Sequence, residues 1–173
     1  MGLQSSIGYE VRTPNLVQRG GQRLASSSVG AKVFAPTAHH VDKLTLRLTR
    51  GHTTFAGFLA GIPVLTITTT GHRSGLPRTM PLLGVPIGDD VALVGTNFGR
   101  ETEPAWVGNL RANPRATVEH RGMRVDAVAR EATPEEREQV LGDAARIYPG
   151  YDAYRARITT RTIPVLVLEL PPS

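Results

Sequence analysis

Residues 64–96 read VLTITTTGHRSGLPRTMPLLGVPIGDDVALVGT and contain three candidate strands. Val64–Thr70 is rich in β-branched residues, and residues 78–87 and 91–96 are largely apolar, a composition typical of strands. The Gly-Asp-Asp sequence at residues 88–90 favours a tight turn between the second and third strands. This stretch therefore predicts an antiparallel sheet that is built from hairpins.

The rest of the chain alternates short strands with helices. Thr133, Pro134 and Glu136 form a capping box, which marks the start of a helix. The other predicted elements are a helix at 104–112, a strand pair at 115–120 and 124–131, a helical segment at 151–157 and a strand at 164–170. Six strands in hairpins, with helices between them, predict a small and mostly antiparallel barrel of the α+β class.

Composition indicates one globular domain with an asymmetric charge. The chain has 173 residues, a formal net charge of +5 and no cysteine, which excludes disulfides, thiolate metal sites and a cysteine nucleophile. Residues 1–50 hold seven basic and two acidic residues, so they carry the whole surplus and the remainder is neutral. A neutral body argues against a nucleic-acid-binding protein. The longest apolar run is about half of the roughly 20 residues that a spanning helix needs.

The N-terminal region differs in composition from the rest. Residues 1–30 are rich in Gly, Ser, Gln and Arg and predict a flexible basic arm, and residues 31–173 predict a single domain that begins with an amphipathic helix. The apolar positions of that helix are Phe34, Ala38, Val41, Thr45 and Leu48. The helix either packs on the domain edge or lies on an anionic membrane surface. Residues 1–50 are therefore a candidate for peripheral contact with the inner face of the cell membrane in an otherwise cytoplasmic protein.

The familiar catalytic signatures are absent from the sequence. It has no Gly-x-Ser-x-Gly elbow, no HExxH helix, no Walker loop and no Gly-x-Gly-x-x-Gly turn after a strand. His39 and His40 are adjacent, so their side chains diverge by about 100° on a helix and do not suit a metal site. Any enzymatic activity is therefore expected to rely on a bound cofactor and on no metal.

The strongest local motif is the basic turn at residues 71–78, GHRSGLPR. Its two glycines and its proline predict a tight turn with free backbone N–H groups, to which Arg73, Ser74 and Arg78 add side-chain donors. Such a nest suits a phosphate or a carboxylate. The alternative is an ordinary basic hairpin turn, and composition alone does not separate the two.

A second Gly-rich loop follows the third strand at residues 95–100, GTNFGR, and also carries donors. The helix that starts near Pro104 comes soon afterwards, and the N–H groups of a helix N-terminus favour anions. Trp106, the single tryptophan, fits either a core position or a cofactor stack.

Three of the four tyrosines are regularly spaced, at Tyr148, Tyr151 and Tyr154. A spacing of three residues places them roughly on one helix face. They form either an amphipathic rim, which packs its rings and exposes its hydroxyls to water, or an aromatic wall over a planar ligand.

Three stretches in series carry a family resemblance: LTITTTGHRSGLPRTMP at 65–81, PAWVGNLRANPRATV at 104–118 and YPGYDAYRARITTRTIPVLVL at 148–168. In order and spacing, over about residues 35–170, the chain resembles the deazaflavin-dependent nitroreductases, actinobacterial proteins that use coenzyme F420. The resemblance implies a split β-barrel of the flavin-reductase (FMN-binding split barrel) type with flanking helices.

The resemblance also implies roles for particular residues. The anionic tail of the deazaflavin would lie against Arg73, Ser74 and Arg78. Tyr148 and Tyr154 would wall the substrate pocket near Thr96, and Tyr151 would contact the cofactor. The full set of implied cofactor contacts is His72, Arg73, Ser74, Arg78, Thr79, Met80, Pro81, Leu82, Leu83, Val94, Gly95, Thr96, Asn97, Ala105, Trp106, Val107, Gly108, Asn109 and Tyr151.

The implied activity is hydride transfer from reduced F420 to a quinone, an enone or a nitroaromatic, and the implied assembly is a homodimer. Asn97 stands where the best-known subgroup carries Lys, and Arg157 or a neighbour stands where it often carries Trp. These departures affect substrate identity and leave the cofactor class unchanged. The alternatives are an FMN- or haem-dependent enzyme on the same barrel, and a non-catalytic F420-binding or membrane-surface protein.

Overall fold

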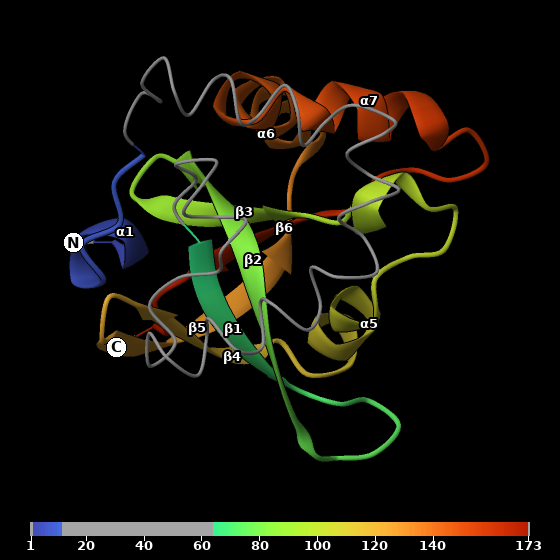
Figure 1. The fold of residues 1–173 in the computed structure, drawn as a ribbon. Helices are drawn as coiled ribbons and strands as arrows, with labels where there is room; N and C mark the ends of the chain where they lie inside the picture. The colour runs from blue at the N-terminus through green and yellow to red at the C-terminus, as the bar shows by residue number, and fades with distance from the viewer. Residues whose placement is uncertain (1, 12–63, 173) are drawn as a thin grey trace.

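A computed structural model describes residues 2–11 and 64–172, and its six strands form a closed antiparallel barrel (Figure 1). The helix expected at residues 34–48 lies outside the described residues. Around the barrel the strand order is β1-β2-β3-β6-β5-β4. The strands are β1 Val64–Thr70, β2 Pro77–Ile87, β3 Asp90–Val94, β4 Arg115–His120, β5 Met123–Glu131 and β6 Val165–Glu169. The predicted α+β barrel is confirmed, and each predicted strand is present with its ends shifted by at most two residues.

The barrel places the basic turn at the end of its longest hairpin. β1 pairs with β2 from Val64 opposite Leu83 to Thr70 opposite Pro77, so the turn follows directly from the last pair. Burial alternates strictly along β1, where Leu65, Ile67 and Thr69 point inward, because successive side chains of a strand face opposite sides. In Figure 1 the turn projects beyond the rest of the barrel.

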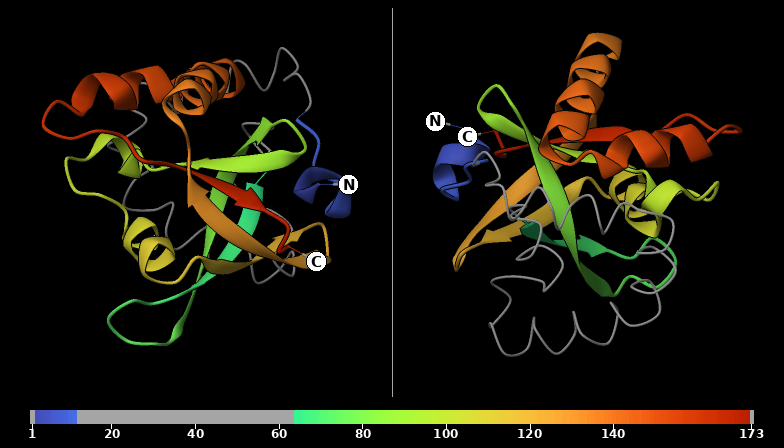
Figure 2. Two further views of the ribbon diagram at one scale, coloured as in Figure 1. Left: turned by 180° about the vertical axis from the view of Figure 1, so that it is seen from behind. Right: turned by 45° about the horizontal axis from the view of Figure 1, so that its top comes forward.

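In the described part of the chain, five helical segments accompany the barrel. They are α1 Leu3–Ser6, the 3-10 turn η1 Asn97–Gly99, α5 Ala105–Ala112, α6 Pro134–Ile147 and α7 Gly150–Arg157. α6 packs on β2 and β3, α7 packs on η1, and α5 packs on β1 and β5. Figures 1 and 2 show α7, η1, α5 and the basic turn following one another along one side of the molecule.

Apolar residues form two core clusters. The first lies inside the barrel and includes Leu65, Ile67, Val107 and Leu168. The second lies between the outer barrel surface and α6 and α7, and includes Val85, Val140 and Ile158. β3 and β6 are buried along almost their whole length because each separates the two clusters, which explains their continuous apolar sequences.

The start of α6 follows the predicted capping box. The Thr133 hydroxyl accepts a hydrogen bond from the Glu136 N–H at 3.2 Å, and a Glu136 carboxylate oxygen accepts one from the Thr133 N–H at 2.8 Å. Among the helices of the described segments, none is both long enough and apolar enough to cross a membrane.

Residues 2–11 correct part of the expected flexible arm. Leu3 and Ile7 are fully buried and Tyr9 is 3% exposed, all within the barrel core cluster. The Tyr9 hydroxyl donates to the Gly84 carbonyl at 2.6 Å. We call residues 2–11 the N-terminal plug. The average composition of residues 1–30 does not reveal these few apolar positions, and they are too few to show a periodicity. Residues 12–30 lie outside the described part of the chain.

Candidate functional site

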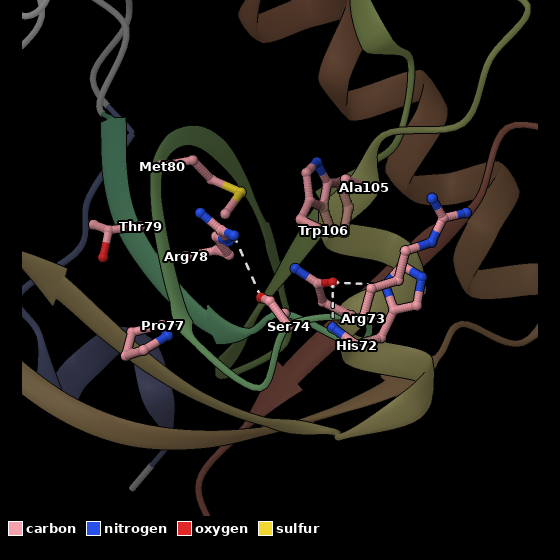
Figure 3. A pocket seen from close by; sticks show the side chains of 11 residues that line it. His72, Arg73, Ser74, Pro77, Arg78, Thr79, Met80, Ala105 and Trp106 are labelled. Atoms are coloured by element: carbon pink, nitrogen blue, oxygen red, sulfur yellow. Dashed lines mark hydrogen bonds between the residues drawn. The ribbon is translucent and has the colours of Figure 1, made fainter.

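A pocket of about 540 Å³ lies between the basic turn, the first half of β2 and the N-terminal half of α5 (Figure 3). Its volume is within the range of small-molecule and cofactor sites. It is lined by Gly71, His72, Arg73, Ser74, Pro77, Arg78, Thr79, Met80, Ala105, Trp106 and Asn109. Three segments that were singled out separately from the sequence therefore meet at one cavity.

The basic turn is tight, as predicted, but four of its backbone donors are not free. The Gly71 N–H bonds to the Leu76 carbonyl at 2.9 Å, and the N–H groups of Ser74 and Gly75 bond to the Gly71 carbonyl at 3.1 and 2.7 Å. The Leu76 N–H bonds to the Ser74 hydroxyl oxygen at 3.3 Å. The expected backbone nest is thus corrected, because the turn uses these N–H groups to close itself.

After these bonds, the side chains of the turn supply the donors for an anion. Arg73 and Arg78 are exposed at the pocket, and neither forms an ion pair with a carboxylate of residues 2–11 or 64–172. One Arg78 nitrogen donates to the Ser74 hydroxyl at 3.3 Å. Ser74 accepts this bond and the one from Leu76, so its O–H can donate to a ligand. Two guanidinium groups without a counter-ion in the described chain suit a phosphate or a carboxylate.

Asn109 ties α5 to the basic turn and to the end of β1. It is 4% exposed, and its carboxamide oxygen accepts from the N–H of His72 at 3.0 Å and pairs with His72 Nδ1 at 2.9 Å. Its amide nitrogen donates to the Thr69 hydroxyl at 3.0 Å. Because a carboxamide oxygen only accepts, His72 must carry a hydrogen on Nδ1. Asn109 therefore positions His72 and the turn, in addition to the ligand contact that is expected of it.

The other implied cofactor contacts divide according to burial. Trp106 is 6% exposed and belongs to the barrel core, as one of its two interpretations expects, and it also borders the pocket. Val107 is fully buried and Val94 is 8% exposed, each within a core cluster, so their side chains have little surface to offer a ligand. The remaining implied cofactor contacts do not line the pocket. They are Pro81, Leu82, Leu83, Gly95, Thr96, Asn97, Gly108 and Tyr151.

Tyr148, Tyr151 and Tyr154 form a tyrosine cluster. Tyr148 ends α6 and the other two lie on α7, with ring centroids 6.0 to 6.2 Å apart. Gly150 is required here because a Cβ at this position would collide with the Tyr148 ring. Burial, followed by the nearby Tyr148, raises the pKa of the Tyr151 hydroxyl and that of Tyr154. Both hydroxyls therefore stay protonated and able to donate at neutral pH.

The loop at residues 95–102, here the η1 loop, leads from β3 towards α5 and packs against α7. The backbone donors expected in it are used internally, because the Gly95 N–H bonds to the Pro164 carbonyl and the Thr96 N–H to that of Val94. The Asn97 side chain donates to the Thr102 carbonyl at 2.9 Å. Thr96 itself is 6% exposed.

Arg161 and Glu101 fix the η1 loop to the segment after α7. The Arg161 guanidinium donates to the carbonyls of Gly95, Thr96 and Arg100, at 3.1, 3.2 and 2.9 Å. The Glu101 carboxylate accepts N–H and O–H bonds from Thr159 and Thr160, and these bonds lower the pKa of Glu101 to about 2. We call this pair the Arg161–Glu101 clamp. Sequence reasoning missed it, because nothing local distinguishes Arg161 from the other arginines.

Comparisons with known proteins find relatives of this chain. A sequence model of the family described as F420H(2)-dependent quinone reductase matches residues 38–170. An F420H(2)-dependent quinone reductase of Mycobacterium tuberculosis is 32% identical over 114 residues, which are 61% of this chain and 72% of that protein.

Two solved structures share the fold with substantial identity. One, described as an F420-H2 dependent reductase (FDR-A), is 36% identical with a TM-score of 0.56, over 61% of this chain and 93% of the other. The second, described as a domain-swapped dimer, is 34% identical with a TM-score of 0.58, over 77% of this chain and 98% of the other.

Proposed function

Because this chain belongs to the F420H(2)-dependent quinone reductase family, we propose that it is an oxidoreductase that uses coenzyme F420 to reduce a quinone. The observation that supports this most directly is the pair Arg73 and Arg78, which border the pocket without an acidic partner in the described residues. F420 carries an anionic tail, as the resemblance implies, and such a tail needs cations of this kind.

The residues of the pocket fit the cofactor in kind and in position. Arg73, Ser74 and Arg78 would hold the anionic tail, and the N-terminus of α5 at Ala105 favours negative charge. Trp106 and Met80 supply apolar surface beside these donors. When bound in reduced form, F420 supplies a hydride, so the protein needs neither a redox cysteine nor a metal of its own.

The tyrosine cluster would serve the acceptor. The hydroxyls of Tyr151 and Tyr154 stay protonated at neutral pH, because burial raises the pKa of each. A protonated hydroxyl can donate to an acceptor oxygen on which negative charge develops. We assign this role to Tyr148, Tyr151 and Tyr154, and we propose that Thr96 of the η1 loop, which packs against α7, also borders the acceptor. Enones and nitroaromatics are further candidate acceptors, and a nitroreductase activity is the narrower form of this proposal.

Assembly and location extend the proposal. The relative described as a domain-swapped dimer supports a homodimer, which size-exclusion chromatography with light scattering would test. Peripheral membrane contact through residues 1–50 stays a prediction: within that range only residues 2–11 are described, and these pack on the barrel.

An F420 titration tests the cofactor assignment. Parent protein, Arg73→Ala and Arg78→Ala would be titrated with F420 and followed by its fluorescence, with FMN as the competing alternative. Loss of one charge-assisted contact should weaken binding about tenfold. Arg124→Ala is the matched control, because Arg124 is an exposed arginine on β5 away from the pocket. If Arg73→Ala and Arg78→Ala bind as tightly as Arg124→Ala, the phosphate site is misplaced.

Turnover distinguishes the enzyme from a binding protein. Reduced F420 would be mixed with the protein and with a panel of quinones and nitroaromatics, and oxidation of the cofactor would be followed by its absorbance. Quinone-dependent oxidation is the expected result. If F420 binds tightly but reduced F420 is not oxidised with any acceptor, the result would favour the non-catalytic alternative.

A further inference from the structure

Phe98 is a large apolar side chain held exposed in an unfavourable backbone conformation. It is 73% exposed, with φ 58° and ψ 28°. Asn97 before it has φ 46° and Gly99 after it has φ 79°, so three consecutive residues lie in the left-handed region. For a bulky residue this conformation is a strained outlier, and such outliers concentrate at functional sites.

The surrounding contacts hold Phe98 in place. The Arg161 guanidinium binds the carbonyls of Thr96 and Arg100, one on each side of Phe98. The Asn97 side chain closes the loop onto Thr102. A Cβ at Gly99 would approach the backbone of Tyr154 at 3.2 Å, so the loop lies directly against α7. These contacts determine the strained backbone and leave the Phe98 ring at the surface.

The exposed ring continues the tyrosine cluster. The Phe98 and Tyr154 ring centroids are 6.1 Å apart with an interplanar angle of 77°, an edge-to-face pair. Tyr154 in turn contacts the two other tyrosine rings. Phe98 is thus the outermost of four rings and the one that lacks a hydroxyl. The other large apolar side chains exposed in the described residues are Leu76, in the basic turn, and Met123, at the start of β5, both away from these rings.

We propose that Phe98 is a substrate-contacting residue that selects flat, apolar acceptors, an inference that rests on the proposed quinone reductase function. A quinone ring is planar and electron-poor, and it would stack on the electron-rich face of the Phe98 ring. The tyrosine hydroxyls beside it could then donate to the quinone oxygens. Only residues 100–104 separate the η1 turn from α5, whose first residues border the cofactor pocket. An acceptor on Phe98 would therefore lie on the cofactor side of the molecule.

The test compares variants of residue 98 with two acceptors of different shape. Phe98→Gly and Phe98→Ala remove the ring, Phe98→Tyr keeps it, and Met123→Ala is the matched control for loss of an exposed apolar side chain. The acceptors are menadione, a flat bicyclic quinone, and cyclohex-2-enone, a small non-aromatic enone. For each variant, KM, kcat, the F420 dissociation constant and Tm would be measured.

The KM for menadione should rise about three- to tenfold in Phe98→Gly and Phe98→Ala, and should return to the parent value in Phe98→Tyr. The KM for cyclohex-2-enone and the F420 dissociation constant should not change. Because glycine adopts positive φ readily, Phe98→Gly should keep or raise Tm. A raised KM for menadione alone, with no loss of F420 binding or Tm, would distinguish substrate contact from a structural role.

Two results would overturn the inference. One is an unchanged menadione KM in Phe98→Gly. The other is a parallel loss of Tm, F420 binding and both KM values, which would indicate a structural residue. If the parent protein does not oxidise reduced F420 with menadione, the proposed function fails instead. Calorimetric titration of menadione into parent and Phe98→Gly would then still decide whether the ring binds a quinone.

Discussion

At the scale of single residues, Asn109 joins the elements around the pocket. This buried amide connects α5 to β1 through Thr69 and to the basic turn through His72. Both ends of its carboxamide are therefore used inside the protein. Asn109 lines the pocket and also sets the position of the residues around it.

Asn109→Ala should lower both stability and F420 affinity. The substitution leaves the N–H of His72 without its partner in a partly buried site, which costs roughly 1–3 kcal/mol, and it releases the turn that carries Arg73. Urea unfolding and F420 titration would measure the two effects. Asn113→Ala is the control, because Asn113 caps only the exposed N–H of Arg115. Equal stability of the two variants would contradict the positioning role.

Tyr151 provides a pH-dependent test at the same scale. Burial raises the pKa of its hydroxyl above the usual value of 10.0, so the O–H donor is present below that pH and is lost only above the raised pKa. Tyr151→Phe should lower kcat, and Tyr151→Ala should also weaken F420 binding through loss of the ring. In the parent, a Tyr151-dependent rate should not decline as pH rises towards 10. Unchanged turnover in both variants would remove Tyr151 from the site.

At the scale of elements, helix α6 begins at a network of charges as well as at a capping box. Arg130 on β5 donates to both carboxylate oxygens of Glu136, at 2.6 and 2.7 Å, and to Glu169. The hydrogen bond from Arg130, followed by that from Thr133, lowers the pKa of Glu136 to about 2. The start of α6 is thus joined to the barrel through an ionised carboxylate.

Glu136→Gln should destabilise the protein in a way that depends on pH. The pKa of Glu136 is lower in the folded state than its ordinary value of 4.5, so its contribution is complete above pH 4.5 and declines as pH falls towards 2. Parent and variant should therefore differ in urea unfolding at pH 7 and converge at low pH. The control is Glu135→Gln, which changes a neighbouring first-turn carboxylate. A difference that is constant with pH would contradict the assignment.

The η1 loop provides a second test of this kind. Lysine cannot reach three carbonyls as the Arg161 guanidinium does, because its donors sit on one compact ammonium. Arg161→Lys should therefore speed hydrogen exchange at the N–H groups of Gly99 and Arg100, which bond within the loop. Arg155→Lys, an exposed change on α7, should leave exchange unaltered. Equal exchange in the two variants would show that the clamp does not hold the loop.

At the scale of the whole molecule, the N-terminal plug is the least expected feature. It packs against β3 and β5, and the Tyr9 ring contacts the ring of His120 at 5.2 Å. The family match begins at residue 38, so the plug lies outside the stretch on which family membership rests. It adds buried apolar surface to a barrel of modest size.

Ile7→Ala should therefore be strongly destabilising. Truncation of a fully buried isoleucine typically costs roughly 2–5 kcal/mol, and Ile7 is 0% exposed. Urea unfolding at neutral pH would measure the loss, with Glu10→Gln as an exposed control in the same segment. If Ile7→Ala unfolds at the same urea concentration as Glu10→Gln, the plug is not part of the folded core.

The sequence by itself determined the strands, the start of α6 and the place of the basic turn. These features follow from alternation, β-branching, turn residues and capping, which act between residues close in the chain. It also located the arginines and tyrosines of the candidate site.

Only the tertiary structure decided that the turn uses N–H groups of its own backbone to close itself, that Asn109 holds His72, that Arg161 fixes the strained loop of Phe98, and that Tyr9 reaches Gly84. All but the first of these contacts join distant parts of the chain. Whether such parts meet depends on how the barrel closes, and no local sequence pattern encodes that.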